Sequence, residues 1–88
     1  MNKKRNKITE VILSDHSLAT VYEPIGYDAL KMASIGAGNT DKMIEYLLTN
    51  LVLVNGGKKD IDYFNSLDFT KVLKLMDIIS RFITKFEL

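Results

Sequence analysis

The sequence of 88 residues contains no cysteine, one histidine, one proline and no long hydrophobic run. Without cysteine the chain cannot form disulfide bonds or thiolate metal sites. No apolar stretch approaches the ~18 residues of a transmembrane helix, and residues 8–13, which follow the basic start, are interrupted by Thr9 and Glu10. We therefore expect neither a membrane span nor a signal peptide, and we expect a cytoplasmic protein.

The chain also lacks a large net charge. Its 12 basic and 11 acidic residues leave a formal charge of +1, which gives no overall attraction to nucleic acid or to an anionic membrane. Hydrophobic residues make up 47% of the chain, which is typical of a globular domain. A chain this short buries little more than ~60% of the surface that its unfolded form exposes. We expect one domain, residues 1–88, with marginal stability unless it oligomerises.

Catalytic and metal-binding motifs are absent as well. His16, the only histidine, lies in a predicted turn where no recognisable motif places a nucleophile beside it. The spacing of Asp60, Asp62 and Asp68 does not match the order of a calcium-binding loop, and the glycines lack the spacing of a phosphate-binding loop. We expect no enzymatic activity, no metal site and no cofactor.

The first quarter of the chain predicts an arm followed by a hairpin. Residues 1–7 are basic and carry no hydrophobic pattern, so we expect them to form a disordered arm. Residues 8–13 and 18–23 alternate β-branched or aromatic residues, and the short polar residues between them favour a turn. This pattern predicts a β-hairpin over residues 8–23. Two strands alone are marginal, so the hairpin should lie on the helices or pair its edges with another subunit.

The first predicted helix follows Pro24, which ends the second strand because it cannot donate to a ladder. The helix should run from residue 26 or 27 to about residue 35. We expect Tyr27, Leu30, Ala33 and Ile35 to face inward, and Asp28 suits the positive end of the helix dipole in the first turn.

The rest of residues 26–88 is predicted to be helical too. A second helix with an apolar core face should start near residue 40 and fade into residues 52–54, before Asn55-Gly56-Gly57 reverses the chain. A single helical turn near residues 60–64 and a long last helix complete the chain. The predicted fold class is α+β, with an N-terminal β-hairpin followed by a small bundle of three main helices, the last one long and broadly apolar.

Residues 67–88 carry more hydrophobic surface than an ordinary helix. Their apolar side chains cover roughly 220° of the circumference, against the ~100° stripe of a surface helix. We interpret one flank as the seal of the core: Phe69, Val72, Met76, Ile79 and Ile83. We interpret the other flank as a partner-binding surface: Leu75, Ile78, Phe82 and Phe86. In the alternative interpretation, the rest of the chain wraps far enough round to bury both flanks.

Three short motifs accompany this order of elements: Tyr-Glu-Pro-Ile-Gly-Tyr-Asp at residues 22–28, Val-Asn-Gly-Gly-Lys-Lys at residues 54–59, and Ile-Asp-Tyr-Phe-Asn-Ser-Leu at residues 61–67. The motifs and the order of the elements resemble those of the tail assembly chaperones of long-tailed bacteriophages. The similarity covers about residues 8–86. The chain departs from the family pattern in the extra Gly57, and in Lys71, where relatives tend to carry an acidic residue.

The resemblance implies a small non-enzymatic protein from a phage or prophage tail gene cluster, made in the host cytoplasm. Such a protein binds the hydrophobic, helical tape measure protein, keeps it soluble until the tail tube polymerises, and is absent from the mature virion. Self-association into a homo-oligomer is expected. In several family members a longer product of the same reading frame, made by ribosomal frameshifting, works beside the short one.

The alternative function is a small nucleic-acid-binding regulatory protein that uses the basic arm at residues 1–7. Nucleic acid is the less favoured partner, because neither a recognition helix nor an aromatic platform accompanies the arm.

Overall fold

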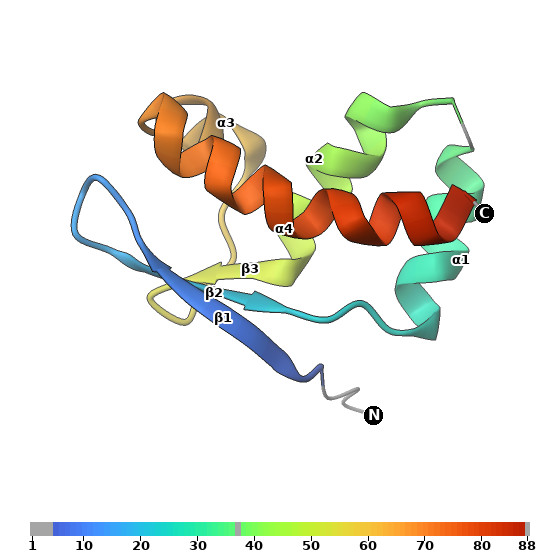
Figure 1. Cartoon of the computed structure of the whole chain (residues 1–88), viewed down its shortest axis with the longest axis horizontal. Helices are drawn as coiled ribbons and strands as arrows, with labels where there is room; N and C mark the ends of the chain where they lie inside the picture. The colour runs from blue at the N-terminus through green and yellow to red at the C-terminus, as the bar shows by residue number, and fades with distance from the viewer. Residues whose placement is uncertain (1–4, 37, 88) are drawn as a thin grey trace.

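The computed structural model describes residues 5–36 and 38–87 and has an α+β fold in which an antiparallel hairpin precedes the helices (Figure 1). The predicted fold class is confirmed, including the long last helix. The elements in chain order are β1 (Lys7–Ile12), β2 (Leu18–Tyr22), α1 (Gly26–Ile35), α2 (Thr40–Leu51), β3 (Val52–Val54), α3 (Ile61–Asn65) and α4 (Phe69–Glu87).

A third strand joins the hairpin, so that the sheet has the antiparallel order β1-β2-β3. The sequence pattern predicts the fading end of a helix at residues 52–54, and this prediction is wrong, because these residues form β3. Val52 and Val54 are buried and pair with Val21 and Ala19 of β2. Their β-branched side chains and the free edge of β2 favour an extended conformation over a further turn of helix.

The two sharp reversals of the sheet use residues with positive φ. His16, exposed in the β1–β2 turn, has a φ of 68°, and Asn55 and Gly56 have φ values of 51° and 83°. Two consecutive positive φ values at Asn-Gly are typical of a type I′ hairpin turn. Val54 and Gly57 exchange backbone hydrogen bonds of 2.8 and 3.0 Å across it. The predicted reversal is confirmed, although it follows a strand and not a helix.

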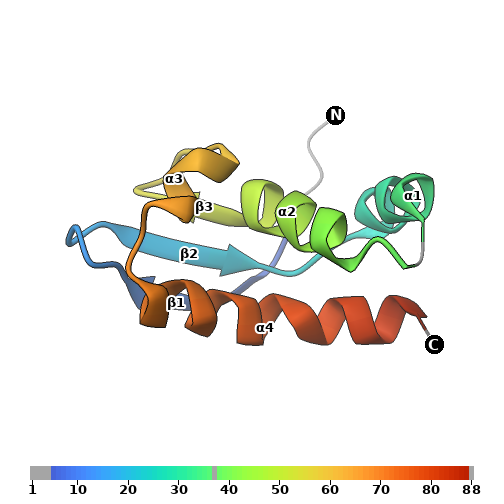
Figure 2. The same cartoon turned by 90° about the horizontal axis from the view of Figure 1, so that it is seen from above.

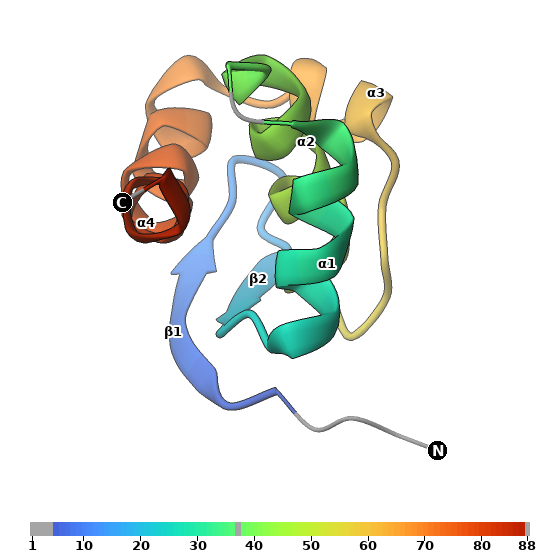
Figure 3. The ribbon, with the colours of Figure 1, turned by 90° about the vertical axis from the view of Figure 1, so that its right-hand side faces the viewer.

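One face of the sheet is covered by α2 and α4 (Figure 3). Seen from above, α4 runs along one side of β2 while α1, α2 and α3 lie on the other (Figure 2). The strand side chains that alternate towards the helices are buried: Val11, Ala19, Val21, Val52 and Val54. The helices complete this core with Met32, Met43, Leu47, Leu48, Leu51, Phe64, Leu75, Ile79 and Ile83.

The short helix α3 confirms the predicted single turn and ties two distant loops together. Asp60 caps it by accepting a hydrogen bond of 3.1 Å from the backbone N–H of Tyr63. The hydroxyl of Tyr63 donates to Asp15 in the β1–β2 turn at 2.9 Å, while Phe64 is buried in the core. The hairpin is therefore held at its tip as well as along its buried face.

Helix α4 is the longest element, with 19 residues. Its solvent side carries exposed charged residues, among them Lys74, Asp77 and Arg81, so the helix is amphipathic. Within residues 5–36 and 38–87, no helix combines the length and the hydrophobicity needed to cross a membrane.

Candidate functional site

The predicted partner-binding residues of α4 lie in different environments. Leu75 is fully buried in the core, so its assignment to an exposed flank is wrong. Ile78 and Phe82 are half-buried and pack against the edge of the core. The side chain of Phe86 lies outside the described part of the chain. Partner binding by Ile78 and Phe82 stays a prediction.

The middle of the apolar arc of α4 faces the core, and this middle contains residues from both predicted flanks. Leu75, Ile79 and Ile83 are buried and lie within roughly 80° of one another around the helix axis. Phe69, predicted to seal the core, is instead 75% exposed, and Leu73 is 46% exposed. The hydrophobic surplus that the arc predicts therefore lies at Phe69 and Leu73, in the first half of the helix.

Helix α1 reverses the expected orientation. Leu30 is 74% exposed and Tyr27 is 53% exposed, so the prediction that they face inward is wrong. Ala33 is exposed too, and of the predicted inward residues only Ile35 is half-buried. The fully buried positions are instead Asp28 and Met32. Asp28, Met32 and Ile35 share the i, i+4, i+7 spacing of a core-facing stripe. The signal was thus present in the sequence, but a carboxylate occupied one of its positions.

Asp28 is fully buried and accepts four hydrogen bonds. Arg5 donates through Nε at 3.2 Å and through Nη2 at 2.7 Å, forming a two-pronged ion pair. The Tyr46 hydroxyl donates at 2.8 Å, and the backbone N–H of Ile25, which precedes α1, donates at 2.7 Å. Asp28 therefore caps its own helix and joins α1 to α2 and to the segment before β1.

These contacts also fix the charge state of the Asp28 network. Burial on its own would raise the pKa of Asp28, but the bonds from Arg5, Ile25 and Tyr46 outweigh it and hold that pKa below its ordinary value. Burial and the bond to the Asp28 carboxylate raise the pKa of Tyr46. A carboxylate with a lowered pKa and filled lone pairs is a poor proton acceptor for catalysis. The network is suited to a structural role.

The basic arm is partly engaged. Arg5 pairs with Asp28, and Lys7 begins β1 and lies 3.2 Å from Glu10. The expected disordered arm at residues 1–7 is therefore wrong for residues 5–7, while residues 1–4 lie outside the described part of the structure. Both cations already have carboxylate partners, which leaves them less free for the phosphate contacts of a nucleic-acid-binding protein.

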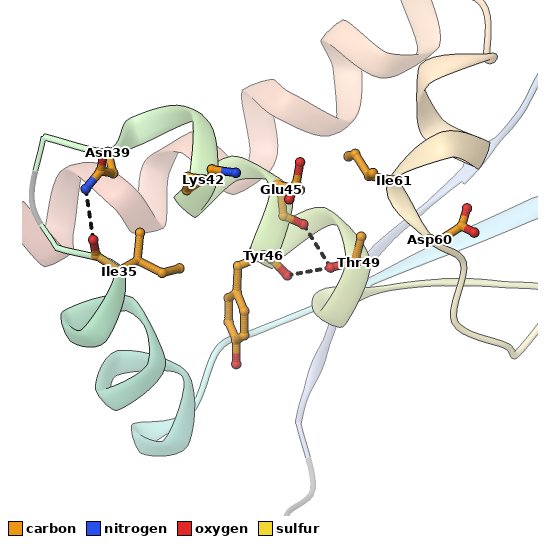
Figure 4. Close-up of a pocket in the computed structure, with 8 residues that line it drawn as sticks. All are labelled: Ile35, Asn39, Lys42, Glu45, Tyr46, Thr49, Asp60 and Ile61. Atoms are coloured by element: carbon orange, nitrogen blue, oxygen red, sulfur yellow. Dashed lines mark hydrogen bonds between the residues drawn. The ribbon is translucent and has the colours of Figure 1, made fainter.

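An open groove of about 740 Å3 lies beside α2 (Figure 4). Half-buried Ile35, Tyr46 and Ile61 provide its apolar surface. Its polar groups are largely used internally: the Thr49 hydroxyl donates to the backbone oxygens of Glu45 and Tyr46 at 2.9 and 3.2 Å. The other hydroxyl of the lining, that of Tyr46, donates to Asp28 on α1, so both hydroxyls are already engaged within the protein.

A second hollow, which we call the α1–α4 groove, lies between α1 and the C-terminal half of α4. Its volume is about 240 Å3. Its lining is mostly apolar and includes one of the predicted partner-binding residues: Pro24, Ile25, Ala29, Met32, Phe82 and Lys85. The structure thus brings Phe82 to the wall of a groove, whereas it places Leu75 beneath the surface.

The part of the chain that the structure describes contains no candidate metal site. No three histidine, aspartate or glutamate side chains gather there closely enough to hold an ion. Asp60 caps α3, and Asp68 accepts a hydrogen bond of 2.7 Å from the Thr70 hydroxyl at the start of α4. Asp60 and Asp68 thus take part in hydrogen bonds at the N-terminal ends of α3 and α4.

Comparison of the chain with protein-family models, with curated proteins and with solved structures gave no match. The family resemblance therefore rests on the order of the elements and on the three motifs. In the structure each motif has an architectural role: residues 22–28 contain the Asp28 network, residues 54–59 form the turn after β3, and residues 61–67 form α3. A function has to be argued from the exposed surface.

Proposed function

We propose that the protein is a non-enzymatic tail assembly chaperone of a phage or prophage, which binds the hydrophobic, helical tape measure protein in the host cytoplasm and keeps it soluble until the tail tube polymerises. One observation carries the proposal: large hydrophobic side chains are exposed on several elements. They are Ile8, Ile12, Tyr27, Leu30, Phe69 and Leu73.

The distribution of these side chains supports this kind of binding. Leu30 on α1 and Phe69 on α4 are each about three-quarters exposed, and Ile12 on β1 is 55% exposed. On each helix the exposed side chains are neighbours one turn apart, Tyr27 with Leu30 and Phe69 with Leu73, and adjacent exposed apolar side chains of this kind mark contact with another protein. Because the residues lie on different elements and not in one enclosed pocket, they provide several weak contacts, which together can hold a long client and still release it.

Self-association is part of the proposal. The strand order leaves the outer edge of β1 unpaired within the sheet, and an unpaired edge can add a strand from another copy. A chaperone that coats a long helical client gains from contacts between neighbouring copies. A longer frameshifted form of the same reading frame would fit the same arrangement.

A solubility assay tests the proposal. We expect Leu30→Asp combined with Phe69→Asp to lose most of the ability to keep a co-expressed tape measure fragment in the soluble fraction. Both side chains are exposed, so the thermal unfolding midpoint should stay near that of the parent.

The matched control is Ser34→Asp combined with Thr70→Asp, which adds the same charge to the same helices at exposed polar positions. It should protect the fragment as the parent does. Equal protection by the Leu30 and Phe69 double variant would contradict the proposed function.

A further inference from the structure

The α1–α4 groove has the dimensions of an anchor pocket. Its volume of about 240 Å3 exceeds the ~150 Å3 of an apolar protein cavity that holds a benzene ring. The α1 side of the lining is uncharged, and Phe82 forms the opposite wall. One bulky aliphatic or aromatic side chain from a partner would fit between the two helices, which is the usual form of an interface anchor.

A basic stripe runs along α4 from this groove. Lys71, Lys74 and Lys85 lie within roughly 60° of one another around the helix axis, on the side that carries Ile78 and Phe82. In the described ranges none of these lysines forms an ion pair, whereas Arg81, further round the helix, is 3.4 Å from Asp77. The stripe therefore presents half-buried hydrophobic side chains bordered by lysines that have no ion-pair partner among the described residues.

The length of the stripe limits what can cover it. From residue 71 to residue 85 the helix rises roughly 21 Å, which equals about four turns of a second helix lying alongside. A helix docked on such a surface uses apolar residues at i, i+3 or i+4, and i+7. Carboxylates on the flank of the docked helix would lie opposite the lysines. Basic side chains at the same positions would be repelled by the lysines.

We propose that the α1–α4 groove and the stripe along α4 bind an acidic amphipathic helix of the client, with one bulky side chain in the groove and its carboxylates against Lys71, Lys74 and Lys85. This inference rests on the proposed function, because it specifies the chemistry of the client segment. It also assigns the recognition of a particular client segment to the groove and the stripe, and not to Leu30 and Phe69.

The charge preference of the stripe is tested with two labelled helical peptides of about four turns. Both carry leucines at the same positions, and they differ only in having either glutamate or lysine on the flanks. Fluorescence anisotropy with the full chain should show binding of the glutamate peptide that weakens with salt, and little binding of the lysine peptide. Lys85→Glu should weaken the glutamate peptide about fivefold and strengthen the lysine peptide. Lys42→Glu, at an exposed position on α2, should change neither.

The groove is tested by filling it. Ala29 lines the groove and is exposed, so Ala29→Phe should occupy the anchor pocket and weaken the glutamate peptide at least fivefold without lowering the unfolding midpoint. The control is Ser34→Phe, at an exposed position on the opposite side of α1, which should leave binding of the glutamate peptide unchanged.

Two results would overturn the inference: equal affinity for both peptides at low salt, or unchanged binding by Ala29→Phe. If Ala29→Phe still keeps the tape measure fragment soluble while the Leu30 and Phe69 double variant does not, this docking site is wrong and the proposed function stands. If both variants protect the fragment, the proposed function itself fails.

Discussion

Helices α1 and α4 bury their inner faces by different means. Helix α4 inserts the middle of a wide apolar arc, with Leu75 and Ile79 completely enclosed. Helix α1 instead buries a carboxylate, Asp28, and leaves Leu30 in solvent. The difference shows that hydrophobic periodicity alone orients a helix only when no polar group on it has partners strong enough to hold another face inward.

The energetic balance in α1 follows from the partners of Asp28. Burying an ionised carboxylate is costly unless it is paired and hydrogen-bonded. Here Arg5, Tyr46 and the Ile25 amide compensate the charge, and no buried side-chain polar atom in the described residues is left without a partner. Leaving Leu30 exposed forgoes the ~1.5–3 kcal/mol that burial of such a side chain typically contributes. Removal of Asp28 should therefore disturb α1 more than any change at Leu30.

The largest effect is expected from Asp28→Ala, which leaves Arg5 and Tyr46 without their shared acceptor. Removing one partner of a buried ion pair typically costs about 3–5 kcal/mol in unfolding free energy, a large part of the stability of a small domain. Urea denaturation followed by circular dichroism would measure the loss. Asp41→Ala, in the exposed first turn of α2, should cost only a few tenths of a kcal/mol, about what the helix dipole contributes. Similar losses for the two variants would mean that the network is not a major source of stability.

In α4 the matched pair is Leu75→Ala and Leu73→Ala. The first substitution removes a fully buried side chain and should lower the unfolding free energy by about 3 kcal/mol, because it leaves a cavity beside α2. The second removes a half-exposed side chain and should cost less than about 1 kcal/mol. The same denaturation experiment separates them. The reverse order would restore the original assignment of Leu75 to a surface flank.

The smallest effect is expected in the loss of unfolding free energy at acidic pH. Asp28 has a lower pKa in the folded protein than the ordinary value of 3.8 that it takes in the unfolded chain. Its stabilising contribution is therefore complete above about pH 4 and is lost as the pH falls through the folded-state pKa. Tyr46→Phe keeps the carboxylate but removes one donor, so the folded-state pKa should move closer to 3.8 and less stability should be lost on acidification. Unfolding free energies measured from pH 7 down to pH 3 would test this, and an identical pH dependence would contradict it.

The candidate surfaces were only partly predictable from sequence. The width of the apolar arc in α4 indicated a hydrophobic surplus, but placing it at Phe69 and Leu73 rather than at Leu75 required knowledge of how the helix is rotated against α2. That rotation depends on side chains from α2 and the sheet, which the α4 sequence does not contain. Strand β3 was missed for a similar reason, since Val52–Val54 becomes a strand by pairing with β2.

Local sequence patterns were enough to locate the hairpin, α1 and the Asn55-Gly56 turn, because alternation, proline and positive-φ residues act over a few neighbouring positions. Which side of each helix faces the core could be seen only in the folded molecule. That choice depends on contacts between residues far apart in the chain, such as Arg5 and Asp28, whose combined burial and hydrogen bonding outweighed the local preference of Leu30 for the interior.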